Sequence, residues 1–313
     1  QLNGISMYSS TNTEEMWDFV KNMGFENLEN RFQYAGSTEV TDMLLGIRYL
    51  FCRNTRKLHT VYKKIGESQS FDLYENPRAL KAGYMVSDSV LDYVMEGTDP
   101  LEVQNRLLSG IAGKRLYKMQ TVSSEAVWAG TVDFDISLKK GEHGYLYIPG
   151  TEPEIVTING QEQKSDYWNN NFLDLGTYDT DTVVHVTAET GMQEAVLGTY
   201  RESDLDEIYE MLSSRQMDLK NGKGTIAAAK DGMLLLSIFY DPDMQIYVDG
   251  KKVDGKSIQG LTGVKFSAGT HTVTMKYRTP GLQAGAVLSI LIAGILGILW
   301  YISRRKMGIS GRL

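Results

Sequence analysis

The sequence predicts an α+β N-terminal unit, two related antiparallel β-sandwich domains of jelly-roll-like type, and one C-terminal transmembrane helix. Three observations lead to this fold class: an early mixture of helical and strand patterns, a repeated strand pattern in the second half, and an uncharged apolar stretch near the end. The expected units, in order, are an α+β unit at 1–115, a first sandwich at 116–200, a helical connector at 201–221, a second sandwich at 222–280, a transmembrane helix at 282–303 and a basic tail at 304–313.

The first unit opens with an amphipathic helix. Thr11 and Glu14 have the spacing of a capping box, and the helix is expected to stop at Gly24. Between these signals, one helical face carries the apolar residues Met16, Phe19, Val20 and Met23. This face predicts that the helix packs on a core with one side.

Strands and a second helix follow in the same unit. Residues 47–52, 60–65 and 70–75 read as strands, and the last two are joined by a polar turn. Residues 100–111 read as a helix that begins with proline. Cys52 is the only cysteine, so an internal disulfide is excluded, and its apolar neighbours predict a buried strand position rather than a nucleophile.

Residues 144–160 and 234–250 form a repeat that aligns without a gap. Each copy reads as an apolar strand, a proline-containing turn, a second strand and a tight turn made by Asn159 or Asp249 followed by glycine. Such pairs are strong hairpin signals. Similar strands follow in both copies, so we expect two related sandwiches whose tight turns occupy matching corners.

The connector between the two sandwiches is expected to be helical. Ser203 is the predicted N-cap. One face of the helix carries the apolar residues Leu205, Ile208, Tyr209 and Leu212. This face predicts that the helix packs on both sandwiches.

The last part of the chain predicts a membrane span. Residues 284–302 carry no charge, and at about 1.5 Å per residue they cover the roughly 30 Å hydrocarbon core of a bilayer. The tail that follows contains no acid and four bases, Arg304, Arg305, Lys306 and Arg312. The positive-inside rule therefore predicts a membrane protein with an extracytoplasmic region at 1–280 and a cytoplasmic C-terminus.

One face of the predicted span consists of small side chains, at Gly285, Ser289, Ala293 and Gly297. Small stripes let helices approach closely in lipid. The expected partners are therefore the lipid bilayer and other transmembrane helices of the same chain. Because the sequence begins at Gln1 without an export signal, we expect those helices in a part of the protein that precedes it.

Charge excludes nucleic acid as a partner. The chain has 32 basic and 39 acidic residues, a formal net charge of −7, and no basic stripe with interleaved aromatic residues. Its apolar content of 42% and charged content of 23% are typical of a folded protein. The composition therefore favours a globular region outside the membrane.

Four Asp-x-Asp pairs are possible metal sites: Asp133/Asp135, Asp179/Asp181, Asp204/Asp206 and Asp241/Asp243. The first pair alternates with apolar residues, as on the solvent face of a strand, and the others fall in turns or in the first turn of a helix. The four histidines stand singly, without the spacing of a zinc site or a catalytic triad: His59, His143, His185 and His271. We therefore predict no catalytic, cofactor-binding or metal-binding residue.

A group of aromatic residues could stack on a sugar ring: Tyr145, Tyr147, Tyr167, Trp168 and Tyr178. Aromatic residues are equally ordinary in the core of a β-sandwich. Both interpretations stay open at this point.

Several segments resemble, in order, the C-terminal part of the YfhO family of bacterial multi-pass membrane proteins: residues 4–10, 37–50, 73–88, 99–108, 246–252 and 268–277, followed by the final span. One position departs from the family pattern. Where the family has Gly-Trp before the Asp-Gly turn, this chain has Asp243 and Met244, so no role of that tryptophan is expected here.

The resemblance implies a preceding bundle of membrane helices similar to glycosyltransferases of the GT-C type. Such enzymes take a polyprenyl-phosphate sugar as donor and decorate cell-envelope polymers such as teichoic acids. Their catalytic acids lie in an early extracytoplasmic loop, so the chemistry is expected outside this chain. The alternative is a non-catalytic, membrane-anchored surface module that binds glycan or protein.

Overall fold

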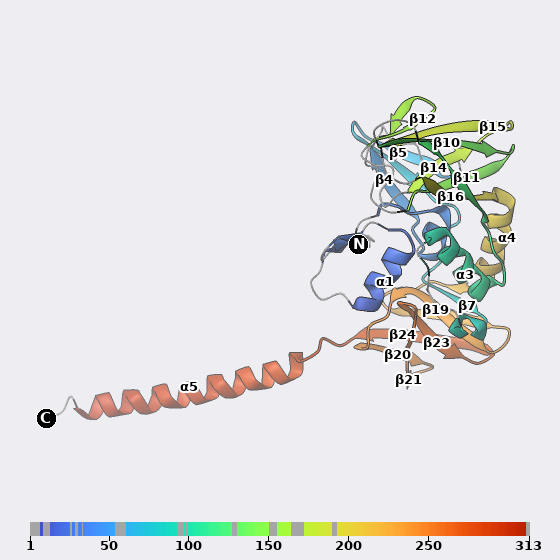
Figure 1. The fold of residues 1–313 in the computed structure, drawn as a ribbon. Helices are drawn as coiled ribbons and strands as arrows, with labels where there is room; N and C mark the ends of the chain where they lie inside the picture. The colour runs from blue at the N-terminus through green and yellow to red at the C-terminus, as the bar shows by residue number, and fades with distance from the viewer. Residues whose placement is uncertain are drawn as a thin grey trace.

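A computed structural model of the chain shows two β-sandwiches with a layer of helices between them and one long helix leading away (Figure 1). The structure describes residues 7–8, 13–25, 27–28, 31–32, 34–53, 61–92, 97, 99–126, 130–149, 155–163, 172–189 and 193–310. Every strand pair within these residues is antiparallel. The predicted fold class, an α+β N-terminal unit followed by two related antiparallel β-sandwiches and a C-terminal apolar helix, is confirmed at the level of mostly antiparallel sheets, few helices and one apolar C-terminal helix.

The first sandwich packs a five-stranded sheet on a four-stranded sheet. The five-stranded sheet has the order β13-β12-β15-β10-β9, with β9 at Glu125–Ala126, β10 at Thr131–Leu138, β12 at Val156–Ile158, β13 at Gln161–Gln163 and β15 at Thr182–Glu189. The four-stranded sheet has the order β14-β11-β16-β8, with β8 at Lys118–Ser123, β11 at Glu142–Tyr147, β14 at Phe172–Thr177 and β16 at Glu194–Arg201.

Alternation along β10 explains why the first sandwich forms. Val132, Phe134 and Ile136 are buried between the two sheets, whereas Asp133 is half-buried and Asp135 is exposed. Successive side chains of a strand point to opposite faces, so one face of β10 joins the core and the other meets water. The interpretation of this Asp-x-Asp pair as the outer face of a strand is confirmed.

The second sandwich combines segments from distant parts of the chain. One sheet has the order β18-β24-β20-β21, with β18 at Lys223–Ala228, β20 at Met244–Val248, β21 at Lys251–Val253 and β24 at Gly269–Tyr277. The other has the order β17-β7-β19-β23-β22, with β7 at Gly83–Val86, β17 at Gln216–Met217, β19 at Gly232–Phe239, β22 at Lys256–Ile258 and β23 at Leu261–Phe266. Because β7 comes from the predicted first unit, residues 222–280 do not complete the second sandwich by themselves.

The two sandwiches share one strand order, which confirms the predicted repeat. β13-β12-β15-β10 in the first corresponds to β21-β20-β24-β18 in the second, and β14-β11 corresponds to β23-β19. The strand beside β11 is β16, which follows β15 directly in the chain. In the second sandwich the corresponding place beside β19 is filled by β7, and the chain after β24 enters the long helix instead.

Among the described residues, four α-helices and one 3₁₀ helix precede the long helix: α1 (Glu14–Asn22), α2 (Glu39–Leu44), η1 (Asp88–Asp92), α3 (Pro100–Ala112) and α4 (Glu202–Ser213). Two predicted caps are wrong. Thr13, not Thr11, caps α1 by accepting a hydrogen bond from the Met16 N–H at 3.3 Å. The α4 helix begins one residue before Ser203 and has no side-chain cap, because β16 runs into it without a loop.

Two small sheets complete the N-terminal region. They have the orders β1-β3-β2, with strands at Met7–Tyr8, Arg31–Phe32 and Asn27–Leu28, and β4-β6-β5, with strands at Tyr49–Arg53, Phe71–Glu75 and Lys63–Glu67. The second of these sheets confirms the three strands predicted after residue 46. Cys52 is buried in β4, as expected.

A third hydrophobic core lies between the sandwiches and is built by the helices. Tyr84 and Leu235 from the second sandwich and Tyr145 from the first join Phe19 of α1 and Leu107 of α3 in one buried cluster. The inner sheets are thus covered on both faces, which is why β7 and β19 are apolar runs rather than alternating strands. The α4 helix contacts both β16 and β7, so the predicted packing on both sandwiches is confirmed.

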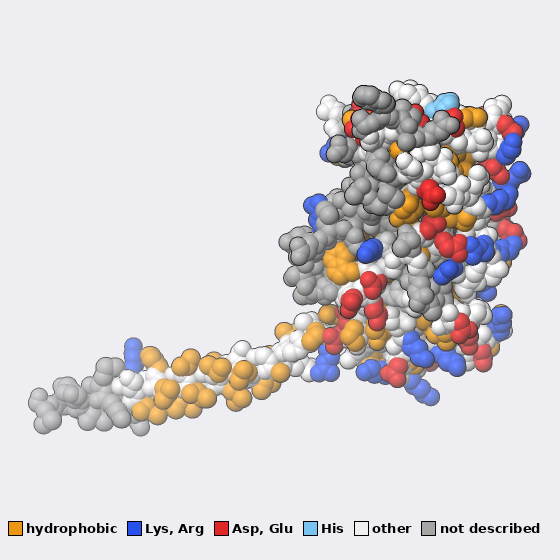
Figure 2. Space-filling view, viewed as in Figure 1, with side chains coloured by type: hydrophobic (Ala, Val, Ile, Leu, Met, Phe, Trp, Pro, Cys, Tyr) orange, Lys and Arg blue, Asp and Glu red, His pale blue; other side chains and the backbone are white. Residues whose placement is uncertain are grey.

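The long helix α5 (Leu282–Ser310) begins shortly after β24 and extends away from the rest of the molecule (Figures 1 and 2). Its segment Leu282–Arg304 is the one described helix that is long and apolar enough to cross a membrane. None of that segment is buried within the protein, and its apolar side chains line the helix in Figure 2. An uncovered and predominantly apolar helix of this length fits a lipid environment.

Candidate functional site

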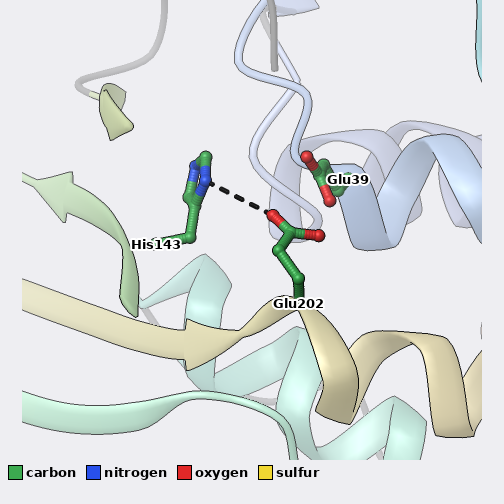
Figure 3. Close-up of side chains that lie close together, drawn as sticks. All are labelled: Glu39, His143 and Glu202. Carbon is green, nitrogen blue, oxygen red and sulfur yellow. Dashed lines mark ion pairs between the residues drawn. The ribbon is translucent and has the colours of Figure 1, made fainter. Parts of the chain in front are cut away.

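Glu39, His143 and Glu202 meet at the junction of the helical layer and the first sandwich (Figure 3). Their facing ligand atoms all lie within 4.8 Å of one another. Only 2% of Glu39 and 1% of His143 is exposed, and the Glu202 side chain is 25% exposed. Three side chains that are far apart in sequence therefore form one largely buried polar cluster.

Local structure explains how each of the three residues reaches this place. Thr38 caps α2 and exchanges capping-box hydrogen bonds with Thr41, so Glu39 is the first residue of the helix. Glu202 is the first residue of α4. His143 on β11 pairs with the residue two positions before Glu202 on β16, which brings the imidazole to the strand-to-helix junction.

Arg78 ties the two glutamates together. Its Nη1 donates to Glu39 Oε2 at 2.9 Å and to Glu202 Oε2 at 2.6 Å, and its Nε donates to Asp206 Oδ1 at 2.8 Å. Burial lowers the pKa of Arg78, but the hydrogen bonds and charges of Asp206, Glu202 and Glu39 outweigh it, so the net pKa is raised. Arg78 thus stays charged and joins the segment after β6 to α2 and α4.

His143 lies between polar groups on both of its ring nitrogens. Nε2 is 2.8 Å from Asp174 Oδ1, and Nδ1 is 3.0 Å from Thr177 Oγ1 and 3.8 Å from Glu202 Oε1. The ring also packs beside Tyr145 and Tyr200, with ring centroids 4.9 Å and 5.2 Å away. The imidazole is therefore held in a fixed orientation by β14 on one side and by two tyrosines on the other.

Tyr200 adds a buried hydroxyl to the cluster. Its side chain is 2% exposed, and its hydroxyl has no hydrogen-bond partner among the described residues. Burial raises the pKa of Tyr200 well above its usual value, and the negative charges of Glu39 and Glu202 raise it further. The phenol therefore stays protonated close to the two carboxylates.

Of the five predicted sugar-stacking residues, the three that the structure describes do not form one platform. Tyr145 is 1% exposed and stacks on Tyr200 inside the core. Tyr147 is half-buried against Phe172 at the start of β14, and Tyr178 lies just after the end of that strand, about 20 Å away along extended chain. Tyr167 and Trp168 lie outside the described residues.

Of the other histidines that the sequence offered as possible site residues, the two that the structure describes do not lie in the buried cluster. His185 contacts Asp135 at 2.5 Å and His271 contacts Asp249 at 2.7 Å, both on outer sheets, and His59 lies outside the described residues. Sequence spacing missed the buried cluster because its members come from three distant segments. The one local signal is His143 itself, a polar residue at the head of an apolar strand.

The small residues of α5 make no contact with another described helix. A methyl group added at Gly285 or Gly297 would meet no described atom within 4 Å. Ser289 and Ala293 are exposed on the same helix. The packing role of this stripe therefore stays a prediction.

The sequence matches a known family of membrane proteins, which agrees with a β-rich region joined to one apolar helix. The sequence profile of the family described as "Bacterial membrane protein YfhO" matches residues 1–289. A search of curated proteins finds no match. Because the profile covers both sandwiches, the helical layer and the start of α5, the chain belongs to the YfhO family of bacterial membrane proteins.

Proposed function

We propose that this chain is the extracytoplasmic region and a C-terminal membrane helix of a YfhO-type protein that supports lipid-linked-sugar-dependent glycosylation of cell-envelope polymers such as teichoic acids. The observation that carries the proposal is the direct connection of β24 to α5 in a chain of this family. A junction of a few residues keeps the second sandwich next to the membrane. An acceptor polymer held there lies within reach of a lipid-linked donor.

The proposed orientation rests on the charges that follow the span. Arg304 and the three further bases after it face one side of the membrane, and no acid accompanies them. Such tails stay in the cytoplasm, which leaves residues 1–280 outside. Protease added to intact protoplasts should therefore digest the sandwiches and spare an epitope fused after Leu313; digestion of the epitope would contradict this orientation.

In this proposal the described residues guide the acceptor and do not catalyse transfer. The polyprenyl-phosphate sugar would be bound by membrane helices outside this chain, in keeping with the resemblance to GT-C enzymes. Among the described residues, Tyr147 and Tyr178 remain accessible candidates for contact with a glycopolymer, because both are half-buried. Tyr145 is not among them, since protein atoms enclose its ring.

Deletion of the gene tests the proposal in cells. The sugar content of purified wall and lipoteichoic acids would be measured by mass spectrometry and NMR in the parent, the deletion strain and a complemented strain. Loss of one sugar substituent, restored by complementation, supports the proposal. Unchanged sugar content across envelope polymers would favour the alternative, a surface module without a role in transfer.

A further inference from the structure

We propose that Glu39, His143 and Glu202 form a binding site for one divalent transition-metal ion, with zinc as the best fit, at the place where α2, β11 and α4 meet. This site is independent of the proposed role in glycosylation. Each residue contributes one ligand atom from a different part of the chain. The ion would connect the helical layer, the first sandwich and the connector.

The geometry of the cluster suits a metal ion of this size. The three ligand atoms lie within 4.8 Å of one another, and His143 Nδ1 is 3.8 Å from Glu202 Oε1. Ligand atoms bound tetrahedrally at 2.0–2.1 Å are roughly 3.4 Å apart, so a contraction of less than about 1.5 Å completes the site. One imidazole and two carboxylates are ligands that Zn²⁺ and Mn²⁺ accept.

The charge of the cluster is compatible with a further cation. Four carboxylates lie around it. Those of Glu39 and Glu202 are buried or largely buried, those of Asp174 and Asp206 are 33% and 53% exposed, and Arg78 contacts Glu39, Glu202 and Asp206. Buried charges are stable when they are compensated. A divalent ion on the faces of Glu39 and Glu202 opposite Arg78 would lie among negative charges, which favours its binding.

Asp174 prepares His143 to act as a ligand. Its carboxylate lies 2.8 Å from Nε2, which favours the tautomer with the proton on Nε2 and the lone pair on Nδ1. A carboxylate on the second ring nitrogen is the usual support of a metal-bound histidine. The Thr177 hydroxyl also reaches Nδ1, at 3.0 Å, and a bound ion would replace this contact.

Two unpartnered oxygen atoms give independent support. Glu202 Oε1 is buried and has no hydrogen-bond partner among the described residues, and the same holds for the hydroxyl of Tyr200. A buried polar atom without a partner is costly. An ion bound by Glu202 Oε1, together with a water molecule on that ion facing Tyr200, would satisfy both atoms.

Burial of the ligands assigns the ion a structural role. Glu39 and His143 are almost fully buried and three-quarters of the Glu202 side chain is buried, which is typical of a structural site and not of an open catalytic one. A structural metal contributes its binding free energy to folding. Removing the ion should therefore loosen the junction between the first sandwich and the helices without affecting a reacting group.

The test uses the full chain, purified in detergent micelles and treated with a chelator. Zinc chloride is added back, bound metal is counted by mass spectrometry after desalting, and thermal unfolding is recorded with and without zinc. We expect one zinc per chain and a rise in Tm of about 5 °C at a hundredfold excess over Kd. His143→Gln should abolish both effects. His185→Gln, on the outer sheet of the same sandwich, is the matched control and should retain both.

Three outcomes would overturn the proposal. The first is that the wild-type chain binds neither Zn²⁺ nor Mn²⁺. The second is that His143→Gln binds as much zinc as the wild type, and the third is that the His185→Gln control loses zinc binding. If His143→Gln does not fold, cobalt decides the question on the wild-type chain. Visible absorption bands from bound Co²⁺ that disappear on addition of zinc support the site, and their absence contradicts it.

Discussion

Asn159 and Asp249 make the same hydrogen bonds at matching corners of the two sandwiches. Asn159 Oδ1 accepts from the His185 N–H at 2.9 Å, and Asp249 Oδ1 accepts from the Thr272 N–H at 2.8 Å. The Asn159 N–H in turn donates to His185 O at 2.8 Å, and the Asp249 N–H donates to Thr272 O at 2.9 Å. Both residues have φ of +50° and precede a glycine with positive φ, as a type I′ hairpin turn requires. The repeat therefore extends to the bonds of individual side chains.

The two corners differ in charge, which predicts a difference in pH dependence. The hydrogen bond from His271 lowers the pKa of Asp249 and raises the pKa of His271. An acid whose pKa is lowered in the folded state stabilises the fold at pH values above its ordinary pKa of about 3.9. A base whose pKa is raised in the folded state stabilises the fold at pH values below its ordinary pKa of about 6.5. The pair therefore stabilises most between these values, and its contribution falls as pH rises through the folded-state pKa of His271.

Asp249→Asn converts the second corner into the first and tests this expectation. The variant keeps the acceptor for the Thr272 N–H but loses the charge beside His271. We expect a lower Tm than wild type near pH 5 and a much smaller difference near pH 9, measured on the full chain in detergent. An equal loss at both pH values would show that the carboxylate charge has no part in stability.

Arg78 is expected to be the most important ion-pair residue of the junction. Arg78→Met leaves Glu39 buried without its cation, which should cost about 3–5 kcal/mol in the free energy of unfolding. The matched control is Arg48→Met, which breaks the exposed pair with Glu75 and should cost less than about 1 kcal/mol. Chemical denaturation measures both values.

A second substitution separates charge from packing at this junction. Glu39→Gln in the Arg78→Met background removes the uncompensated charge, so part of the lost stability should return. If the double variant is less stable than Arg78→Met, the buried charge is not the cause of the loss.

Gly260 allows the second sandwich to approach α1 closely. A Cβ at this position would lie 2.7 Å from Glu15 O and 2.9 Å from the Cβ of Phe19, and φ is +99°. Gly260→Ala should therefore cost about 1–3 kcal/mol for the clash in addition to about 1 kcal/mol for the backbone. Gly250→Ala is the control, since it has positive φ but no atom within 4 Å. Equal losses, by denaturant unfolding, would rule out a tight contact at Gly260.

The small stripe on α5 can be tested separately from membrane insertion. Gly297→Leu lies on the stripe and Gly294→Leu lies off it, and both glycines have open space around them. In the complete protein in cells, we expect both variants to reach normal membrane levels, but only Gly297→Leu to reduce envelope-polymer glycosylation, because it separates packed helices. Full glycosylation in cells with Gly297→Leu would show that α5 only attaches the chain to the membrane.

Much of the fold could be predicted because its signals are local. The Asx-Gly turns fix two hairpins, and Pro100 begins α3 as the sequence predicts. The place of β7 could not be predicted, since an apolar run of four residues does not specify which sheet it will join. Its partner β19 lies far along the chain, and only the assembled core selects that pairing.

The buried cluster was missed for a related reason. Glu39, Arg78 and Glu202 follow no spacing that distinguishes them from exposed charged residues, and their burial results from the packing of three segments. The Asp-x-Asp pairs, which do have a spacing, proved to be separate surface features with one exception. Asp206 takes part in the junction through Arg78, as a partner and not as a metal ligand.

Transfer of labelled sugar from a polyprenyl-phosphate donor tests the central claim most directly, namely that this chain supports glycosylation carried out elsewhere in the protein. The complete protein and residues 1–313 alone would be reconstituted in parallel liposomes with the same donor and a teichoic acid acceptor. The account predicts that label enters the polymer with the complete protein and not with the chain alone. Transfer by residues 1–313 alone, or no transfer by the complete protein, would contradict it.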